Sequence, residues 1–289
     1  MSGVASIDGR VVALSGALVP VVDRGFLYGD AVFEALRTYR GEADALEQHL
    51  SRLSRSCSIL GIDLPVPLSV LAVEVREAIA AVPEPEHYVR LMITRGDLPE
   101  GLAPKGQQRA RRVILVRPLV LVPESLYADG LRVSTVVAPP SALTAGAKPS
   151  AYLTNLLALG AAQRQGRDDA LLLGAHGELL EGATSSLFLV QGRTLCTPPL
   201  ALGILPGITR DRIWTVAERL GLSVREKLLF VHDAYRADEL LLTSSVRQVV
   251  GVAAVDGCTI GSGRPGPITR QVAAAYRAEV GLDPAGSAG

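Results

Sequence analysis

Apolar residues in this chain change repeatedly between a spacing of two and a spacing of three to four residues. The stretch AVFEALRTYRG, residues 31–41, alternates apolar and polar side chains and predicts a strand. In residues 46–60 the apolar side chains fall on one face of a helix. Asp8-Gly9, between two β-rich pieces, predicts a hairpin. Because both halves of the chain mix helices and strands in this way, we expect an α/β or α+β fold.

The remaining expected elements follow the same two patterns. Strands are expected at residues 87–96, 111–122, 131–137, 168–173, 185–190, 193–197, 239–244 and 249–255. Helices are expected at residues 68–81, 152–165, 207–221 and 267–280. Pro123 and the polar stretch after it interrupt the pattern. We therefore expect a small N-terminal domain at 1–120, a linker at 121–130 and a larger C-terminal domain at 131–289.

Charge, hydropathy and cysteine content exclude several classes of function. The formal net charge is zero and no basic stripe is present, so nucleic-acid binding is not expected. The most apolar run is interrupted by Arg117 and Pro118, and the first ten residues lack the pattern of a signal peptide. The cysteines and histidines are scattered without metal-ligand spacing. We expect a cytoplasmic protein with no metal and no membrane segment.

Lysine is rare in this chain, and one lysine stands in an unusual setting. The sequence has only three lysines, whereas arginine carries nearly all other positive charge. Lys148 lies in GAKPSAYLTN among small uncharged residues, whereas Lys105 lies in a polar loop and Lys227 beside charged neighbours. A desolvated lysine can lose its proton and form an imine, which arginine cannot do. Lys148 is therefore a candidate nucleophile; the alternative is an ordinary solvated lysine.

Two segments could bind a phosphate group. In PGITRDR, Gly207 lets the backbone approach closely, and the N–H groups of Ile208 and Thr209 point outward from the start of a helix. In LTSSVRQ, a turn after a strand presents the hydroxyls of Ser244 and Ser245. Each segment alone is a common pattern, and only their combination indicates a site for a phosphate-bearing cofactor.

Two charged side chains complete this expectation. Arg52 on the first helix could neutralise a phosphate; the alternative is a surface pairing with Glu47. In GELLEGATSS, Glu181 lies at the end of a strand beside small residues that could admit a ring. A carboxylate facing the nitrogen of a pyridinium ring keeps that nitrogen protonated, which such cofactors need. The alternative for Glu181 is an exposed acid at a strand end.

Together these motifs resemble the fold type IV pyridoxal-phosphate enzymes, the class IV aminotransferases. The resemblance covers nearly the whole chain and rests on motifs in the same order as in the family: DRGFLYGDAVFEALRTYRG, HLSRL, Lys148 four residues before Tyr152, GELLEGATSSLFLV, LPGITRDRI and ADELLLTSSVRQVVGV. It implies two mixed α/β domains with the cofactor, pyridoxal 5'-phosphate, between them. It also implies a homodimer in which the neighbouring subunit completes each active site.

The resemblance assigns roles to individual residues. It implies that Lys148 is the Schiff-base lysine and that Glu181 partners the pyridine nitrogen. Tyr152 would donate to the phenolic oxygen of the cofactor. The residues that hold the phosphate would be Arg52, Ile208, Thr209 and Ser245, and the hydroxyl of Ser244 lies in the same turn.

Within the family, the first domain should select the substrate. HYVRLMITRGD is similar to the branched-chain subgroup, whose Tyr-x-Arg pair corresponds to Tyr88 and Arg90 here, and Tyr28 and Phe33 fit its aromatic pocket. The D-amino-acid subgroup has an Arg-x-His carboxylate trap after this strand, whereas this chain has no histidine there and has Glu100 in place of the arginine. The turn TSSVRQ also departs from the branched-chain pattern, which has Gly-Thr-Ala.

The resemblance implies transamination between an amino acid and a 2-oxo acid, with branched-chain L-amino acids or L-glutamate favoured and relaxed specificity possible. Three alternatives remain open on the sequence. One is a D-amino-acid or (R)-amine transaminase, and another is an aminodeoxychorismate lyase, which needs only the cofactor core. The third is a catalytically silent binding protein that kept the fold.

Overall fold

The computed structural model describes residues 2–97, 102 and 109–282. Two compact units are distinguished, Met1–Val120 with Gly146–Tyr152, and Leu121–Ala145 with Leu153–Gly289. The segment that contains Lys148 thus belongs to the first unit, although it lies beyond residue 130. Glu100 and Lys105 lie outside the described residues, so their expected settings stay predictions.

The first unit contains one antiparallel sheet of six strands in the order β2-β1-β6-β5-β3-β4. The strands are β1 (Val4–Ile7), β2 (Arg10–Ala13), β3 (Ala31–Tyr39), β4 (Glu42–Ala43), β5 (His87–Thr94) and β6 (Arg111–Pro118). The helices are α1 (Arg24–Tyr28), α2 (Leu46–Leu60) and α3 (Leu68–Ala80), with a 3-10 turn η1 at Leu14–Gly16. The expected hairpin is confirmed, because Asp8 and Gly9 join β1 and β2 with positive φ angles of 51° and 85°.

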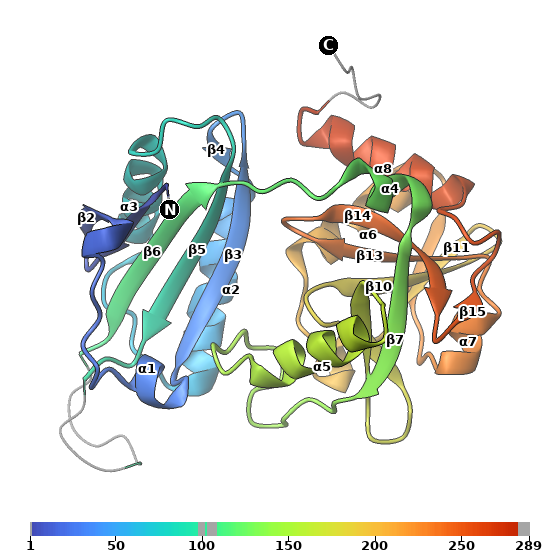
Figure 1. Ribbon diagram of the computed structural model, residues 1–289, viewed down its shortest axis with the longest axis horizontal. Helices are drawn as coiled ribbons and strands as arrows, with labels where there is room; N and C mark the ends of the chain where they lie inside the picture. The colour runs from blue at the N-terminus through green and yellow to red at the C-terminus, as the bar shows by residue number, and fades with distance from the viewer. Residues whose placement is uncertain (1, 98–101, 103–108, 283–289) are drawn as a thin grey trace. The chain divides into compact units, whose positions relative to one another are not determined.

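Helices α2 and α3 cover one face of this sheet and lie behind it in Figure 1. The core there joins Leu36 of β3 and Leu91 of β5 to Leu53 of α2 and Leu71 of α3. Since neighbouring residues of a strand point to opposite faces, Phe33 on β3 and Arg90 on β5 lie on the other face. That other face carries the residues expected to select the substrate.

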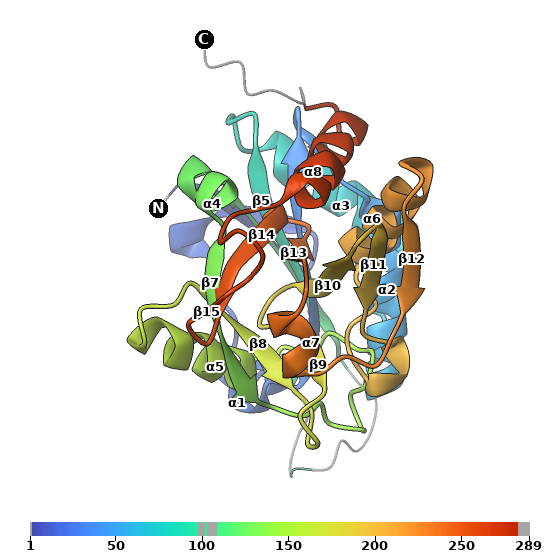
Figure 2. The same cartoon turned by 90° about the vertical axis from the view of Figure 1, so that its right-hand side faces the viewer.

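The second unit contains a mixed sheet in the order β12-β11-β10-β13-β14-β7-β8-β9, with β15 paired to β14. Its strands are β7 (Leu131–Val137), β8 (Asp169–Leu173), β9 (Leu179–Gly182), β10 (Ser186–Gln191), β11 (Thr194–Thr197), β12 (Ser223–Glu226), β13 (Glu239–Ser244), β14 (Gln248–Val255) and β15 (Cys258–Thr259). Its helices are α4 (Glu124–Asp129), α5 (Leu153–Arg164), α6 (Ile208–Arg219), α7 (Val231–Tyr235) and α8 (Pro267–Glu279), with a 3-10 turn η2 at Leu200–Leu202. Figure 2 shows these elements from the side.

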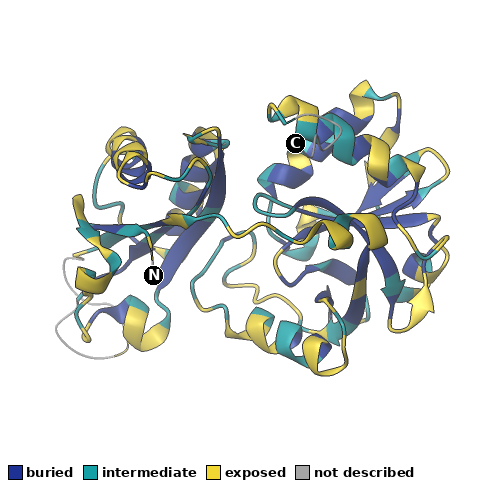
Figure 3. Cartoon of the chain, turned by 45° about the horizontal axis from the view of Figure 1, so that its top comes forward, coloured by how far each residue is buried: buried dark blue, intermediate teal, exposed yellow. Residues whose placement is uncertain are grey.

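Both faces of this second sheet are buried. On β10, Phe188 and Val190 pack with α6 and α8, whereas Leu187 and Leu189 belong to the core on the opposite face. The central strands are accordingly dark blue in Figure 3, while the helices carry yellow outer surfaces. A sheet buried on both faces offers ligands only its ends, so any site of this unit must be built from loops at strand ends.

One expected strand end differs from the structure. The strand expected at 111–122 ends at Pro118, because proline has no N–H to donate to the ladder. The segment expected as a linker contains helix α4, whose Tyr127 donates a hydrogen bond of 3.1 Å to the carbonyl of Arg247. Across the described residues, no helix is both long and apolar enough to span a membrane.

Candidate active site

The backbone around Lys148 is held against the start of β3 by an isolated antiparallel bridge. The N–H of Phe33 donates to the carbonyl of Lys148 (3.0 Å), and the N–H of Ser150 donates to the carbonyl of Ala31 (2.8 Å). Val32 and Pro149 form an antiparallel bridge between them. The N–H of Lys148 donates to Oγ of Ser56 on α2 (3.1 Å). Lys148 is therefore fixed by a strand and a helix together and does not extend from a solvated loop.

The amine of Lys148 lies between two aromatic rings. Its Nζ is 4.5 Å from the ring centroid of Phe33 and 5.5 Å from that of Tyr152. The two rings meet edge to face at 5.4 Å. An ammonium group is attracted to ring faces, and the rings also remove water from one side of it. The expected cofactor residues Lys148 and Tyr152 and the expected substrate residue Phe33 are thus brought together.

Arg90 joins this group from the neighbouring strand. Its guanidinium carbon lies 3.8 Å from the Phe33 ring centroid, on the opposite side of the strand pair from the helices. Tyr88 is two residues earlier on β5 and therefore on the same face, where the guanidinium of Arg117 lies 5.5 Å from its ring. Within residues 2–97, 102 and 109–282, Arg90 forms no ion pair, and its guanidinium lies over the Phe33 ring.

Tyr28 is the last residue of α1, and half of its surface is exposed. The guanidinium of Arg24 lies 5.0 Å from its ring centroid. Gly29 follows with a φ of 67°, and a Cβ there would come within 3.2 Å of Ala151. This close approach places the end of α1 beside the Lys148 segment.

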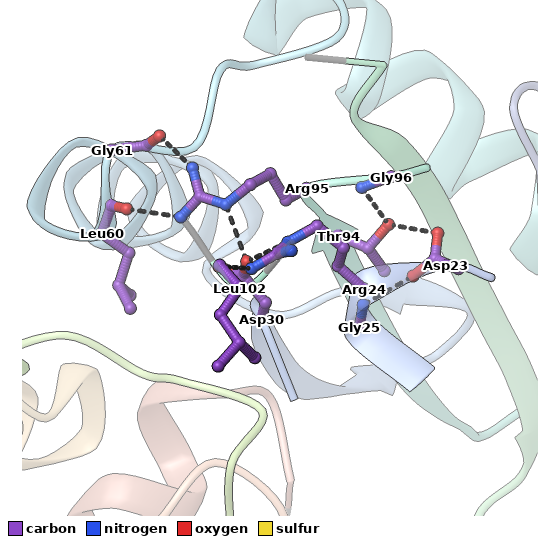
Figure 4. Close-up of polar contacts among 10 residues, drawn as sticks. All are labelled: Asp23, Arg24, Gly25, Asp30, Leu60, Gly61, Thr94, Arg95, Gly96 and Leu102. Carbon is purple, nitrogen blue, oxygen red and sulfur yellow. Dashed lines mark hydrogen bonds and ion pairs between the residues drawn. The ribbon is translucent and has the colours of Figure 1, made fainter. Parts of the chain in front are cut away.

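A partly buried ionic cluster around Asp30 fixes α1, the start of β3 and the end of α2 (Figure 4). Oδ2 of Asp30 accepts hydrogen bonds of 2.8 Å from Nε of both Arg24 and Arg95. Arg95 also donates to the carbonyls of Leu60 and Gly61, which end α2. Burial alone would raise the pKa of Asp30, but the hydrogen bonds from the two arginines lower it below its ordinary value. Asp30 therefore stays charged and holds both guanidinium groups.

The adjoining Asp23 has a structural role. It caps α1 by accepting the N–H of Gly25 (2.7 Å), and it also accepts the hydroxyl of Thr94 (2.8 Å), as Figure 4 shows.

Arg52 is buried on α2 and forms a two-point ion pair with Glu34 of β3, at 2.9 Å and 2.6 Å. The surface pairing with Glu47 that we considered is wrong, because Glu47 pairs with Arg76 instead. His49 Nδ1 lies 2.7 Å from the second oxygen of Glu34. Arg52 is one helical turn before Ser56, so both lie on the same stripe of α2. This stripe of α2 therefore contacts both β3, through Arg52, and the Lys148 segment, through Ser56.

The ion pair between Glu34 and Arg52 makes the free energy of unfolding depend on pH. Burial raises the pKa of Glu34, but hydrogen bonds from Arg52 and His49 outweigh burial and lower it from 4.5 to about 2. At pH values between these two pKa values, the folded state therefore binds fewer protons than the unfolded state. The stabilisation is complete above pH 4.5 and is lost as the pH falls towards 2, which corresponds to about 3 kcal/mol.

We expect Glu34→Gln to remove this pH dependence. In urea unfolding, the difference in free energy of unfolding between wild type and Glu34→Gln should shrink by about 3 kcal/mol as the pH falls from 4.5 towards 2. Glu47→Gln, at an exposed pair, serves as the control. A constant difference across this range would show that Glu34 is not held charged by Arg52.

In the second unit, Glu181 lies near the end of β9 and is partly buried. Its Oε2 accepts the N–H of Leu205 (3.3 Å). The residues after it are small, and Gly182 and Ser185 close a tight turn through a hydrogen bond of 2.7 Å. The hydroxyl of Ser185 is buried and has no hydrogen-bond partner among the described residues. An unsatisfied buried hydroxyl beside a carboxylate is typical of a place where a polar ligand sits.

The start of α6 lies beside this turn. Gly207 precedes the helix, and a Cβ there would come within 2.5 Å of Oγ of Ser186, so a larger residue would have to displace that hydroxyl. The first N–H groups of a helix, here those of Ile208 and Thr209, have no partner within the helix. They form with the helix dipole a favourable position for an anion.

The third segment of the second unit that we expect at the cofactor is the turn between β13 and β14, residues 244–247. Thr243 pairs with Ser186 across β13 and β10, which places Ser244 and Ser245 at the same end of the sheet as Gly207. Oγ of Ser244 accepts the N–H of Arg247 (3.2 Å). The predicted ring partner, helix start and hydroxyl turn are thus collected at one end of the second sheet, and their chemistry fits a ring that carries a phosphate.

Sequence reasoning missed two buried acids that organise these groups: Glu34 and Asp169. Each pairs with an arginine that is distant in sequence or on another element, so no local spacing indicated the pair. Among the described residues, no group of three His, Cys, Asp or Glu side chains could hold a metal ion.

The first unit holds an amine beside two aromatic rings, and the second holds a helix start beside a carboxylate. Both kinds of group suit an aldehyde cofactor that bears a phosphate. The comparisons agree with this class. The family model described as Amino-transferase class IV matches residues 31–255. The chain belongs to this family and is a pyridoxal-phosphate-dependent aminotransferase of fold type IV.

Three similar proteins show the range of the family. The putative branched-chain-amino-acid aminotransferase of Methanocaldococcus jannaschii is 35% identical over 92% of both chains. The D-alanine aminotransferase of Bacillus licheniformis is 31% identical, over 93% of this chain and 94% of that protein. The crystal structure of the T.th. branched-chain amino acid aminotransferase with pyridoxamine 5'-phosphate has a TM-score of 0.91 and 26% identity, and the match covers 97% of this chain and 94% of that one.

Proposed function

We propose that the protein transfers the amino group of a branched-chain L-amino acid or of L-glutamate to a 2-oxo acid. The observation that carries this proposal is the arrangement around Phe33, where the amine of Lys148 and the guanidinium of Arg90 both lie over one ring. An apolar ring with a fixed positive charge suits a substrate that has an apolar side chain and carboxylates. The names of the branched-chain relatives support the same substrate class.

Pyridoxal phosphate supplies an aldehyde that accepts the amino group and a ring that withdraws electrons from the substrate. We assign to Lys148 the covalent attachment of that aldehyde and, once its amine is released, proton transfer at the substrate α-carbon through Nζ. We assign to Glu181 the protonated state of the ring nitrogen, and to Tyr152 a hydrogen bond to the phenolic oxygen. Tyr28, Phe33, Tyr88 and Arg90 are the proposed substrate contacts.

We assign the phosphate to Arg52, Ile208, Thr209, Ser244 and Ser245. The helix start supplies N–H donors and the turn supplies hydroxyls, as described for the second unit. Arg52 supplies positive charge and is oriented by the two-point pair with Glu34. Since a guanidinium has five N–H donors, a carboxylate on one edge leaves donors for a phosphate.

Arg90 is proposed to let one pocket accept two kinds of substrate. Its guanidinium can pair with the second carboxylate of L-glutamate, and it can stay stacked on Phe33 when the side chain is apolar. Binding a substrate carboxylate in a desolvated pocket without its charged partner costs several kcal/mol, whereas binding of an apolar side chain is weakened little.

We therefore expect Arg90→Ala to slow the reaction with L-glutamate much more than the reaction with L-leucine. The measurement is the second-order rate constant with which each amino acid converts the bound cofactor to its amine form, followed by visible absorbance. The ratio of the two constants should shift by roughly tenfold or more towards L-leucine. Arg76→Ala, at an exposed pair, should leave the ratio unchanged. An equal loss for both substrates would restrict Arg90 to supporting the fold.

A D-amino-acid specificity is the second candidate, because a D-alanine aminotransferase is among the relatives at 31% identity. The absence of the Arg-x-His pattern in RGDLPEGLAP favours the L-amino-acid assignment. If D-alanine is a better donor than L-leucine for the wild-type enzyme, the D-amino-acid candidate replaces our proposal.

We also propose that the protein is a homodimer. Four apolar side chains before and within α1 are exposed on the single chain, namely Leu18, Val21, Val22 and Phe26. A contiguous apolar segment of this kind is typical of a surface covered by a partner. Sedimentation equilibrium should give twice the mass of the chain, and a monomer at micromolar concentration would contradict this.

A further inference from the structure

Arg247 closes the turn between β13 and β14 and ties it to three other elements. Its Nη2 donates to Oδ2 of Asp169 (2.6 Å) and to Oγ1 of Thr184 (3.1 Å). Its N–H donates to Oγ of Ser244, and its carbonyl accepts the hydroxyl of Tyr127 on α4. Both ends of the turn are therefore fixed by this one residue.

Asp169 is a rigid anchor for this contact. It begins β8, which is paired to β7 on one side and β9 on the other, and it is only 1% exposed. A carboxylate buried to this degree needs a charged partner, because an unpaired buried charge is strongly unfavourable. Arg247 is that partner, with its own side chain 22% exposed. The position of the turn is thus set by the interior of the sheet.

Thr184 belongs to the segment that follows Glu181. The carbonyl of the preceding residue, Ala183, accepts the side-chain amide of Asn155 on α5 (2.8 Å). The guanidinium of Arg247 therefore joins two segments that the proposed function assigns to one cofactor: residues 181–186 at its ring and residues 244–247 at its phosphate.

We propose that Arg247 is a positioning residue that sets the register between the ring-binding and the phosphate-binding segments. This inference rests on the proposed phosphate role of Ser244 and Ser245. Because Arg247 is neutralised by Asp169, the pair adds little net attraction for an anion at a distance, and its contribution is geometric. A turn whose donors are already in place loses less conformational entropy when the ligand binds.

The test compares pyridoxal 5'-phosphate with pyridoxal, which has the same aldehyde and ring but no phosphate. Dissociation constants of both are measured by equilibrium dialysis against cofactor-free protein. Wild type should prefer the phosphate compound. Arg247→Ala should weaken the binding of pyridoxal 5'-phosphate by roughly tenfold and the binding of pyridoxal much less. The preference for the phosphate compound should therefore shrink. Arg264→Ala, an exposed arginine of the same unit, should keep the wild-type preference.

Two milder variants keep the test decisive if Arg247→Ala does not fold. Arg247→Lys keeps a charge for Asp169 but not the planar group that reaches Thr184, and it should restore part of the preference. Thr184→Val removes the hydrogen bond to Arg247. It should lower the preference for the phosphate compound without changing the melting temperature of the cofactor-free protein.

The outcomes separate this inference from the proposed function. If wild type binds both compounds equally, the phosphate role of the turn is wrong. If wild type prefers the phosphate compound and all three variants keep that preference, the phosphate role stands and the positioning role of Arg247 is overturned. An equal loss of both affinities together with a lower melting temperature would show that Arg247 serves the fold alone.

Discussion

Lys148→Ala abolishes transamination while the protein still folds and still binds pyridoxal phosphate without a covalent bond. The reason is that no other described amine takes the position between Phe33 and Tyr152, where Nζ of Lys148 lies 4.5 Å and 5.5 Å from the two ring centroids. The substitution removes both the attachment point and the group that moves the proton, so no measurable steady-state rate should remain. The measurement is product formation from L-leucine and 2-oxoglutarate.

Other lysine variants separate chemistry from charge. Lys148→Arg should be as inactive as Lys148→Ala, because a guanidinium does not deprotonate in a protein. Lys227→Ala loses a partly exposed contact of 3.2 Å with Asp233 and should remain active, as should Lys105→Ala. Near-normal turnover in either Lys148 variant would show that the attachment lysine has been assigned wrongly.

Glu181→Gln lowers the rate of amino-group transfer by roughly two to four decades but leaves covalent attachment intact. A neutral amide still accepts the N–H of Leu205, which Glu181 accepts at 3.3 Å, so the local structure should be kept. The amide has no charge to hold the ring nitrogen protonated, so the ring withdraws electrons less strongly. Stopped-flow absorbance with saturating L-leucine measures this rate directly.

Glu178→Gln is the matched control for this experiment. Glu178 precedes β9 by one residue, and one of its oxygens accepts the N–H of His176 (3.0 Å), a contact that glutamine can keep. We expect its transfer rate to stay close to that of wild type. If Glu181→Gln is as fast as Glu178→Gln, the partner of the ring nitrogen lies elsewhere.

Local patterns predicted most elements of the fold because they depend on neighbours in sequence. The apolar stripe of 46–60 is α2, and Asp8-Gly9 forms the hairpin. The same reasoning extended a strand past Pro118, because apolar composition continued there. It did not indicate the short helix α4, which lies in the polar segment that follows.

In the candidate site, too, contacts between residues distant in sequence could not be predicted from local patterns. Lys148 was singled out by composition, but its contact with Phe33 depends on a β-bridge to β3, which is more than a hundred residues away in sequence. Arg52 was compared with Glu47 on its own helix, whereas its partner is Glu34 on a strand. Arg247 and Asp169 are separated by 78 residues, so neither sequence segment alone indicates their pair.

The central claim, transamination with branched-chain L-amino acids and L-glutamate, is tested most directly by comparing amino donors on the holoenzyme. Each donor is mixed with enzyme, and conversion of the bound cofactor to its amine form is followed by absorbance. The donors are L-leucine, L-glutamate, D-alanine, (R)-phenylethylamine and aminodeoxychorismate. We predict the largest second-order rate constants for L-leucine and L-glutamate, with one 2-oxo acid released for each amino group transferred. A larger constant for D-alanine or (R)-phenylethylamine, or cleavage of aminodeoxychorismate without amino-group transfer, would contradict the account.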